Sequence, residues 1–146
     1  MTKTFILEFE NGLPRTTAQQ KGEAIRYNKE GRAYIQHYRK AKVQALRSEL
    51  IYRMKRYAPA RPSAEPIRLS VLICFDIKDK KLWGKYKTTR PDGDNYIKEL
   101  KDAMKECGFY IDDAQVCDER IVRTYAERGS IRVQMEDLHQ PGRVIT

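Results

Sequence analysis

The chain has 146 residues, the size of one domain, which excludes a multidomain protein. Hydrophobic residues make up 40% of it, enough for a packed core, so a chain that is disordered throughout is excluded as well. Lysine and arginine outnumber aspartate and glutamate by 29 to 20, and the resulting net charge of +9 indicates a polyanionic partner, nucleic acid first.

The first half of the chain predicts one strand, one long loop and one long helix. Residues 4–10 are apolar and β-prone and end at Asn11-Gly12, which predicts an opening strand and a turn. Residues 13–31 are polar and basic without a helical period, so we expect a long loop with at most a short strand near residues 25–27. Residues 34–57 carry apolar side chains at three- to five-residue steps among basic ones, which predicts an amphipathic helix with a basic outer face.

The second half predicts three strands and a second helix. Residues 67–77 alternate between apolar and other side chains and form the clearest strand of the chain. Residues 78–90 contain six basic side chains without a regular period, which indicates a mobile basic loop. Residues 94–107 show a helical apolar stripe that begins at acidic capping residues and stops at Gly108. Two further strands are expected at residues 114–125 and 130–136.

These elements predict an α+β fold with a single mixed β-sheet packed by two main helices. We expect one domain over residues 1–137 and a C-terminal tail over residues 138–146, where Pro141 and Gly142 interrupt any regular structure. The order of the strands does not follow from the sequence.

The sequence predicts neither a membrane span nor a site built from cysteines. No stretch approaches the roughly 20 apolar residues of a membrane span, and the N-terminal apolar run is too short for a signal peptide, so we expect a cytoplasmic protein. The three cysteines, Cys74, Cys107 and Cys117, lie far apart, and the two histidines lie in no recognisable ligand spacing. A disulfide framework and a zinc cluster are therefore not expected.

The charge changes sign along the chain. Residues 1–90 carry a net charge of +13 and residues 91–146 a net charge of −4. A solvated helix face and a polar turn would account for the acids in an ordinary way. The alternative is that a divalent cation lies between these carboxylates and a nucleic-acid phosphate.

Acids and a lysine surround the start of the second predicted helix. Asp92 and Asp94 flank a glycine just before it, Asn95 follows, and Lys98 lies one turn later on the same helix face as Asp94. Either aspartate could be a simple N-cap, and Lys98 could form an ordinary surface ion pair. However, one helix does not need several capping side chains.

A second acidic pair follows that helix. Asp112 and Asp113 end a short apolar run, where a strand can carry a side chain back beside the helix start, although a polar turn is the simpler interpretation. Several carboxylates near a lysine in a basic protein match the needs of Mg²⁺-assisted phosphodiester hydrolysis. In that reaction the metal ion activates water and neutralises charge on the phosphate, and the lysine stabilises the attacking group.

Two segments resemble motifs of the RusA family of Holliday-junction resolvases. Pro91-Asp92-x-Asp94-Asn95-x-x-Lys98 is similar to the family segment P-D-x-D-N-x-x-K, and residues 112–116 are similar to its D-D-x-Q-V segment. A helix separates the two motifs, as in the family. The resemblance is strong over residues 67–136 and weaker before them, and Gly93 replaces the larger residue that is common between the two aspartates.

The resemblance implies a RusA-like fold and a homodimer that cuts branched DNA, most of all four-way junctions, by paired nicks. It implies Mg²⁺ as the cofactor, with Mn²⁺ as a substitute, and a bacterial, phage or prophage origin. The implied catalytic residues are Asp92, Asp94, Lys98 and Asp113, and the implied metal ligands are the three aspartates together with Asp112. The residues expected to contact DNA are Asn95, Lys85, Lys87, Arg90, Lys21 and Arg123.

Two alternatives remain open at this stage, and a third is disfavoured by its spacing. The basic segments alone would suit a non-catalytic DNA-binding accessory protein of recombination. A metal-dependent nuclease of another specificity is also compatible with the acids. Pro91-Asp92 with Glu99 and Lys101 imitates the PD-(D/E)xK signature, but Glu99 and Lys101 lie in a predicted helix, where residues two apart diverge.

Overall fold

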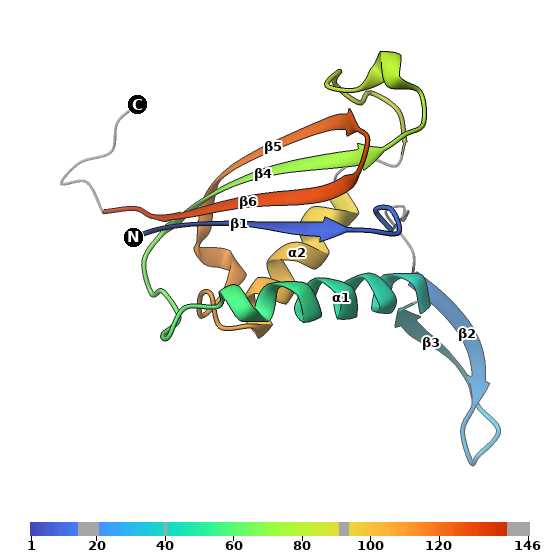
Figure 1. Cartoon of the computed structure of the whole chain (residues 1–146). Helices are drawn as coiled ribbons and strands as arrows, with labels where there is room; N and C mark the ends of the chain where they lie inside the picture. Colours follow the sequence, from blue (N-terminus) through green and yellow to red (C-terminus); the bar gives the residue numbers. More distant parts are fainter. Residues whose placement is uncertain (15–20, 40, 91–93, 140–146) are drawn as a thin grey trace, which may run out of the picture.

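Four strands form one mixed sheet, in the order β1-β6-β4-β5 (Figure 1). They are β1 (Thr2–Phe9), β4 (Ile67–Asp76), β5 (Val116–Ala126) and β6 (Gly129–Asp137). β6 is antiparallel to both β1 and β4, whereas β4 and β5 are parallel. The computed structural model describes residues 1–14, 21–39, 41–90 and 94–139. The predicted α+β class and the four predicted strands are confirmed.

β4 is the central strand of the core because of its alternating sequence. Its side chains at every second position, from Ile67 to Phe75, are buried, and those between them are not. Apolar side chains of β1 and β6 continue the same buried face. The alternation in residues 67–77 therefore identified the inner face of the sheet correctly.

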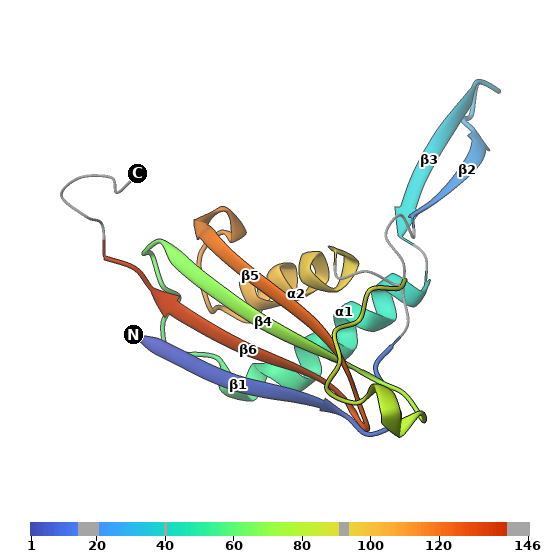
Figure 2. The same ribbon diagram turned by 90° about the horizontal axis from the view of Figure 1, so that it is seen from above.

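Two helices cover that face and leave the other one open (Figures 1 and 2). They are α1 (Ala41–Met54) and α2 (Asp94–Glu106). Parallel strands need a long crossover connection, and α2 lies in the crossover between β4 and β5. α2 agrees with the prediction at both ends, and Gly108 follows it at a φ of 84°, a conformation that glycine adopts readily.

The prediction for residues 13–57 was wrong in one respect, because the first helix begins only at Ala41. Before it, β2 (Lys21–Tyr27) and β3 (Ala33–Arg39) form an antiparallel hairpin, where we expected a loop followed by the first turns of the helix. The turn between them is closed by hydrogen bonds from the Gly31 N–H to the Asn28 carbonyl and from the Arg32 N–H to the Asn28 side chain. An Asn-x-x-Gly turn between β-prone segments favours a hairpin, and this local signal outweighs the short helical spacing in residues 34–38.

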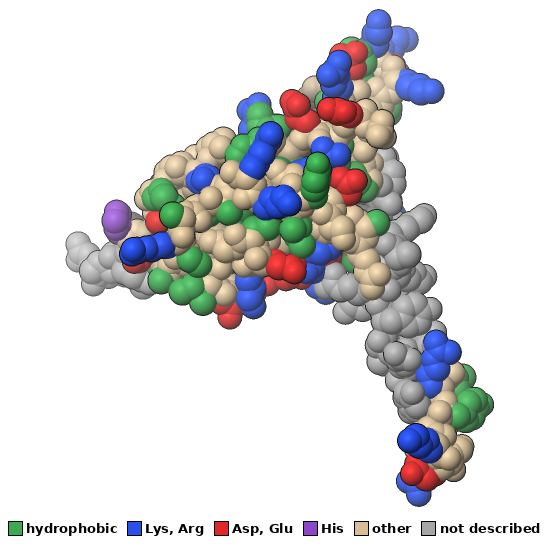
Figure 3. Space-filling view, turned by 60° about the horizontal axis from the view of Figure 1, so that its bottom comes forward, with side chains coloured by type: hydrophobic (Ala, Val, Ile, Leu, Met, Phe, Trp, Pro, Cys, Tyr) green, Lys and Arg blue, Asp and Glu red, His purple; other side chains and the backbone are tan. Residues whose placement is uncertain are grey.

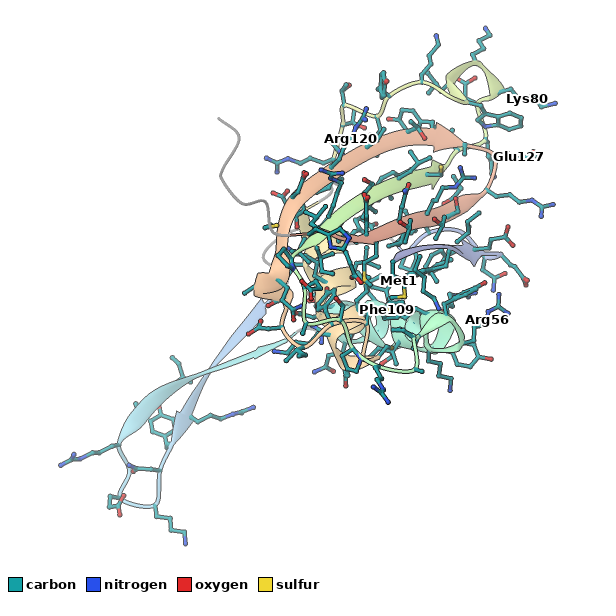
Figure 4. All side chains as sticks on the ribbon, turned by 90° about the vertical axis from the view of Figure 1, so that its left-hand side faces the viewer. Met1, Arg56, Lys80, Phe109, Arg120 and Glu127 are labelled. Atoms are coloured by element: carbon teal, nitrogen blue, oxygen red, sulfur yellow. The ribbon has the colours of Figure 1, made fainter. Side chains whose placement is uncertain are left out.

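The basic segment after β4 is held in place, in contrast to the mobile loop that we expected. It contains the short 3-10 helix η2 (Lys80–Leu82), where Lys80 projects outward (Figure 4). The Trp83 indole donates to the carbonyl of Ile77 at 2.8 Å. Residues 84–87 then exchange backbone hydrogen bonds with the outer edge of β5. Because residues 84–87 extend the sheet, this part of the loop is fixed beside β5.

Two further 3-10 helices complete the described structure, η1 (Lys55–Tyr57) after α1 and η3 (Asp113–Gln115) before β5. Leu138 and His139 follow β6 without regular structure, and the rest of the expected tail lies outside the described residues. None of the described helices is long and apolar enough to cross a membrane.

Candidate active site

The first turn of α2 carries one of the predicted acids. Asp94 is the first residue of the helix and is exposed, whereas the next three side chains, Asn95, Tyr96 and Ile97, are buried. A carboxylate at this end is favoured by the helix dipole. Lys98 is exposed one turn later. The buried side chains anchor the helix, so that Asp94 and Lys98 project from a fixed surface.

The second acidic segment is the capped turn η3. The Asp112 carboxylate accepts a hydrogen bond from the Ala114 N–H at 3.1 Å, and the Gln115 side-chain oxygen accepts one from the Asp112 N–H at 2.8 Å. The Gln115 amide group also donates to two carbonyl oxygens in the segment before β4, at 2.8 and 2.9 Å. The D-D-x-Q pattern is thus a doubly capped turn tied to its neighbour, and it fixes the position of Asp113.

The two acidic segments meet in one open cleft of about 350 Å³ between α2, η3 and β5. Asp94, Lys98 and Asp113 all line it. The fourth predicted catalytic residue, Asp92, lies outside the described residues. The remaining lining residues are Ile97, Lys101, Asp102, Glu119 and Ile121. Folding therefore brings together three side chains that the sequence motifs had singled out from two separate segments.

Carboxylates crowd together at Asp113. A hydrogen bond with Asp112 raises the pKa of Asp113, and partial desolvation and the nearby Asp102 carboxylate raise this pKa further. The pKa of Asp112 is lowered, chiefly by the hydrogen bond from the Ala114 N–H. Neighbouring carboxylates resist being charged together, and a hard divalent cation relieves that repulsion. The oxygen donors of this cleft therefore fit an ion such as Mg²⁺. Within the described ranges, no three His, Cys, Asp or Glu side chains lie close enough to form a metal-binding group.

Arg47 of α1 supports the acidic side of the cleft. Its guanidinium contacts the carboxylates of Glu99 at 2.6 Å, Asp102 at 2.7 Å and Glu106 at 3.8 Å. Glu99 is only 1% exposed, and the Arg47 guanidinium offsets the charge of its buried carboxylate. Arg47 thereby joins α1 to α2 and fixes Asp102 at the wall of the cleft.

The chain entering the first motif is anchored at Thr89. The Thr89 carbonyl accepts hydrogen bonds from the Lys87 ammonium and, at 3.3 Å, from the Arg123 guanidinium, and its hydroxyl lies 2.9 Å from that of Tyr125. Lys87 is 6% exposed, and its ammonium lies 4.8 Å from the centre of the Phe75 ring. Two cationic side chains therefore hold the backbone shortly before the acidic segment.

The six residues expected to contact DNA occupy different environments. For the basic residues, exposure matters because a buried ammonium group attracts a DNA phosphate less than an exposed one does. Lys85 and Arg90 are exposed, Arg123 is half-buried, Lys87 and Asn95 are buried, and Lys21 begins β2 in the hairpin.

Three charged residues of the cleft were missed by the motifs. Asp102 lies eight residues after Asp94, about two helical turns, so helical periodicity could have placed both on one face. Lys101 pairs with Glu119 of β5 at 2.6 Å. No spacing in the sequence links these two, since their contact depends on how β5 lies beside α2.

A strongly basic chain with carboxylates and a lysine in one open cleft has the features of a nuclease that works on nucleic-acid phosphates. The family model described as "Endodeoxyribonuclease RusA" matches residues 14–136. The chain belongs to the RusA family of endodeoxyribonucleases. The resemblance in the two motifs is thereby confirmed.

Two relatives are similar to the chain over different extents. The "Crossover junction endodeoxyribonuclease rusA" of Lactococcus phage r1t is 31% identical over 136 residues, which is 92% of this chain and 98% of the relative. The "Uncharacterized protein YqaN" of Bacillus subtilis (strain 168) is 39% identical over 51 residues, 35% of each chain. The similarity to the phage enzyme spans both the acidic cleft and the hairpin.

Proposed function

We propose that this chain resolves Holliday junctions by hydrolysing phosphodiester bonds in the cleft between α2, η3 and β5. The observation that carries the proposal is that Asp94, Lys98 and Asp113 line one cleft. The nearly full-length similarity to a phage crossover junction endodeoxyribonuclease supports the choice of substrate, and branched DNA is the substrate of this family.

Nucleases of this family depend on a metal ion, and Mg²⁺ suits the oxygen donors of this cleft. Asp94 and Asp113 would hold the ion together with Asp92, and the adjacent Asp112 carboxylate, which caps the same turn, adds negative charge that favours a cation. When bound, Mg²⁺ supplies an activated water molecule and positive charge at the phosphate. Mn²⁺, which accepts the same oxygen ligands, should substitute for it.

The chain's own side chains have separate tasks in this scheme. The Lys98 ammonium, exposed at the cleft, stabilises negative charge that develops on the phosphate and orients the attacking group. Lys87 and Arg123 keep the backbone at Thr89 in place, and so position the segment that carries Asp92. The exposed Lys85 and Arg90 contact the DNA backbone.

A homodimer suits the symmetry of the substrate. A four-way junction has near-twofold symmetry, so an isologous dimer would present one cleft to each of two opposed strands. Paired nicks at symmetric positions follow from that arrangement.

The test compares wild type, Asp94→Asn and the control variant Glu127→Gln on a labelled four-way junction and on linear duplex of the same sequence. Wild type and Glu127→Gln should cut the junction in Mg²⁺ or Mn²⁺ and not in EDTA. Asp94→Asn should bind the junction but cut it about 100-fold more slowly or not at all, because a ligand of the metal ion is lost. Glu127 is an exposed acid at the turn between β5 and β6 and lies outside the cleft, so it controls for the loss of one negative charge.

Three results would contradict the proposal. Cleavage by Asp94→Asn at the wild-type rate would show that the cleft is not the active site. Equal cleavage of junction and duplex would indicate a nuclease of another specificity, and binding without any cleavage by the wild type would favour a non-catalytic accessory protein.

A further inference from the structure

The β2–β3 hairpin stands away from the body of the molecule (Figures 1 and 2). Its two strands pair along their whole length, from Lys21 opposite Arg39 to Tyr27 opposite Ala33. An isolated two-stranded ribbon is at best marginally stable in water, and stable β-structure usually has a further surface to pack on. The projecting hairpin is therefore suited to a partner that binds along it.

The outer end of the hairpin combines apolar and basic side chains with an acidic one (Figure 3). Ile25 is 67% exposed and Tyr27 is 71% exposed, and because they are two residues apart they lie on one face of the ribbon. Arg26 lies between them, and Lys29 and Arg32 are exposed at the turn. Two large apolar side chains on one face of a projecting ribbon, beside cations, suit a contact surface.

The segment that follows β1 is joined to the start of α2. The hydroxyl of Tyr96 donates a hydrogen bond to the carbonyl of Pro14, in the segment that leaves β1 toward the hairpin. Tyr96 is fully buried and lies two residues after Asp94. β3 in turn leads into α1, and the hairpin leaves the body at the end where α1 and α2 begin (Figures 1 and 2). A partner held by the hairpin would therefore lie next to the acidic cleft.

We propose that the β2–β3 hairpin is a DNA-binding arm that lies in a groove of one duplex arm of the junction. Residues 21–39 contain five basic and two acidic side chains, which favours a polyanion over a protein surface. A seven-residue ribbon is about 23 Å long, and the major groove, about 12 Å wide, admits a two-stranded ribbon. Lys29 and Arg32 contact phosphates, and the face with Ile25 and Tyr27 contacts the sugars and base edges. This proposal rests on the proposed function, because it assumes that the chain binds Holliday junctions. It does not depend on which residues hold the metal ion.

Salt dependence of binding tests the phosphate contacts. The Lys29→Ala/Arg32→Ala double variant is compared with Arg61→Ala/Arg132→Ala, which removes two exposed charges outside the hairpin. Junction affinity is measured in EDTA, so that no cleavage occurs, between about 50 and 200 mM salt. The hairpin variant should bind at least about fivefold more weakly than wild type, and its slope of log K against log salt should be shallower by about 2, at 0.9 for each lost phosphate contact. The control should keep the wild-type slope, and an unchanged slope in the hairpin variant would overturn the proposal.

A second comparison tests the apolar face. Tyr27→Ala is paired with Tyr52→Ala, because Tyr52 on α1 is 70% exposed, almost the same as Tyr27. Tyr27→Ala should weaken junction binding about tenfold, and Tyr52→Ala less than twofold. Sedimentation of the DNA-free protein should be unchanged by either substitution. If Tyr27→Ala converts an oligomer to monomers, the hairpin is a protein contact and the proposal is wrong. Wild-type cleavage of junctions stays intact in either case, so failure of the arm is distinguishable from failure of the proposed function.

Discussion

The surroundings of Asp113 disfavour the charged form of its carboxyl group. Its neighbours Asp112 and Asp102 raise its pKa, so in the metal-free protein the charged carboxylate is disfavoured relative to the unfolded chain. The folded pKa lies above the unfolded one. Below the pKa of Asp113 in the unfolded chain, the carboxyl group is protonated in both states and does not lower the stability. Above its pKa in the folded protein, the full destabilisation is present. The metal-free protein therefore loses stability as the pH rises between these two pKa values.

Asp113→Asn should accordingly change stability and activity in opposite directions. At pH 7 without metal, the variant should melt at a higher temperature than wild type, and this difference should shrink as the pH falls toward 4. Mg²⁺ at ten times its dissociation constant should stabilise wild type by about 1.4 kcal/mol, or about 4 °C, and should not stabilise the variant. Junction cleavage by the variant should fall about 100-fold or more. Thermal melts with and without Mg²⁺, together with a cleavage assay, measure all three effects, and equal Mg²⁺ stabilisation of both proteins would exclude Asp113 as a ligand.

At the residue scale, the sequence predicted the acids that belong to linear motifs and missed those that depend on packing. Asp94 and Lys98 are one helical turn apart, and Asp113 lies in a turn whose capping residues are local. The contact of Arg47 with Asp102 joins two residues that are 55 positions apart in the chain, and no local pattern encodes it.

One guanidinium and a buried carboxylate add to the apolar packing of α1 against α2. Replacing Arg47 removes the 2.6 Å ion pair of a carboxylate that is only 1% exposed, which is much more costly than losing a surface ion pair. Asp102, on the wall of the cleft, depends on the same guanidinium.

Arg47→Met should therefore lower the free energy of unfolding by about 3 kcal/mol or more. The double variant Arg47→Met/Glu99→Leu should recover most of that loss, because no uncompensated charge remains buried. Arg68→Met serves as the control and should cost less than about 1 kcal/mol, since its ion pair with Asp118 is about half exposed on both sides. Urea unfolding of the four proteins checks this, and a double variant that is less stable than Arg47→Met would contradict it.

At the element scale, segments with a strong periodicity were predicted correctly as helix or strand, and a segment with a weak periodicity was not. β4 alternates over its whole length, and α2 has both an apolar stripe and a stop at Gly108. Residues 34–38 match a helical step only briefly, and the Asn28–Gly31 turn was the stronger signal. Tertiary pairing decided the path of residues 84–87, because their partner is the edge of β5.

At the scale of the whole molecule, the positive and negative net charges lie in different parts of the chain. The first 90 residues hold a net charge of +13, including the hairpin and the loop with Lys85 and Arg90, and the rest of the chain holds −4 and most of the cleft. A phosphate attracted by the first part meets carboxylates that only a cation makes compatible with it.

A homodimer with one cleft per strand makes a prediction for mixed dimers. Wild type and Asp94→Asn are refolded together at equal concentrations, so that half of the dimers contain one of each chain. Such dimers should nick one strand of a circular cruciform substrate, whereas wild-type dimers cut both and give linear product. The ratio of nicked to linear DNA should therefore rise well above that of wild type alone. An unchanged ratio, or a wild-type protein that sediments as a monomer while it makes paired nicks, would contradict the dimer.

The parallel pairing of β4 with β5 also determines when this protein can become active. Ile67 pairs with Val116, so the strands that bracket α2 come from distant parts of the chain and join only after the crossover is complete. Asp94 lies within that crossover and Asp113 near its end, and both line one cleft with Glu119 and Ile121 of β5. A chain that has not yet docked β5 therefore has no assembled cleft. Under the proposed function, a nascent or partly unfolded copy would attract DNA through its basic first half without being able to cut it.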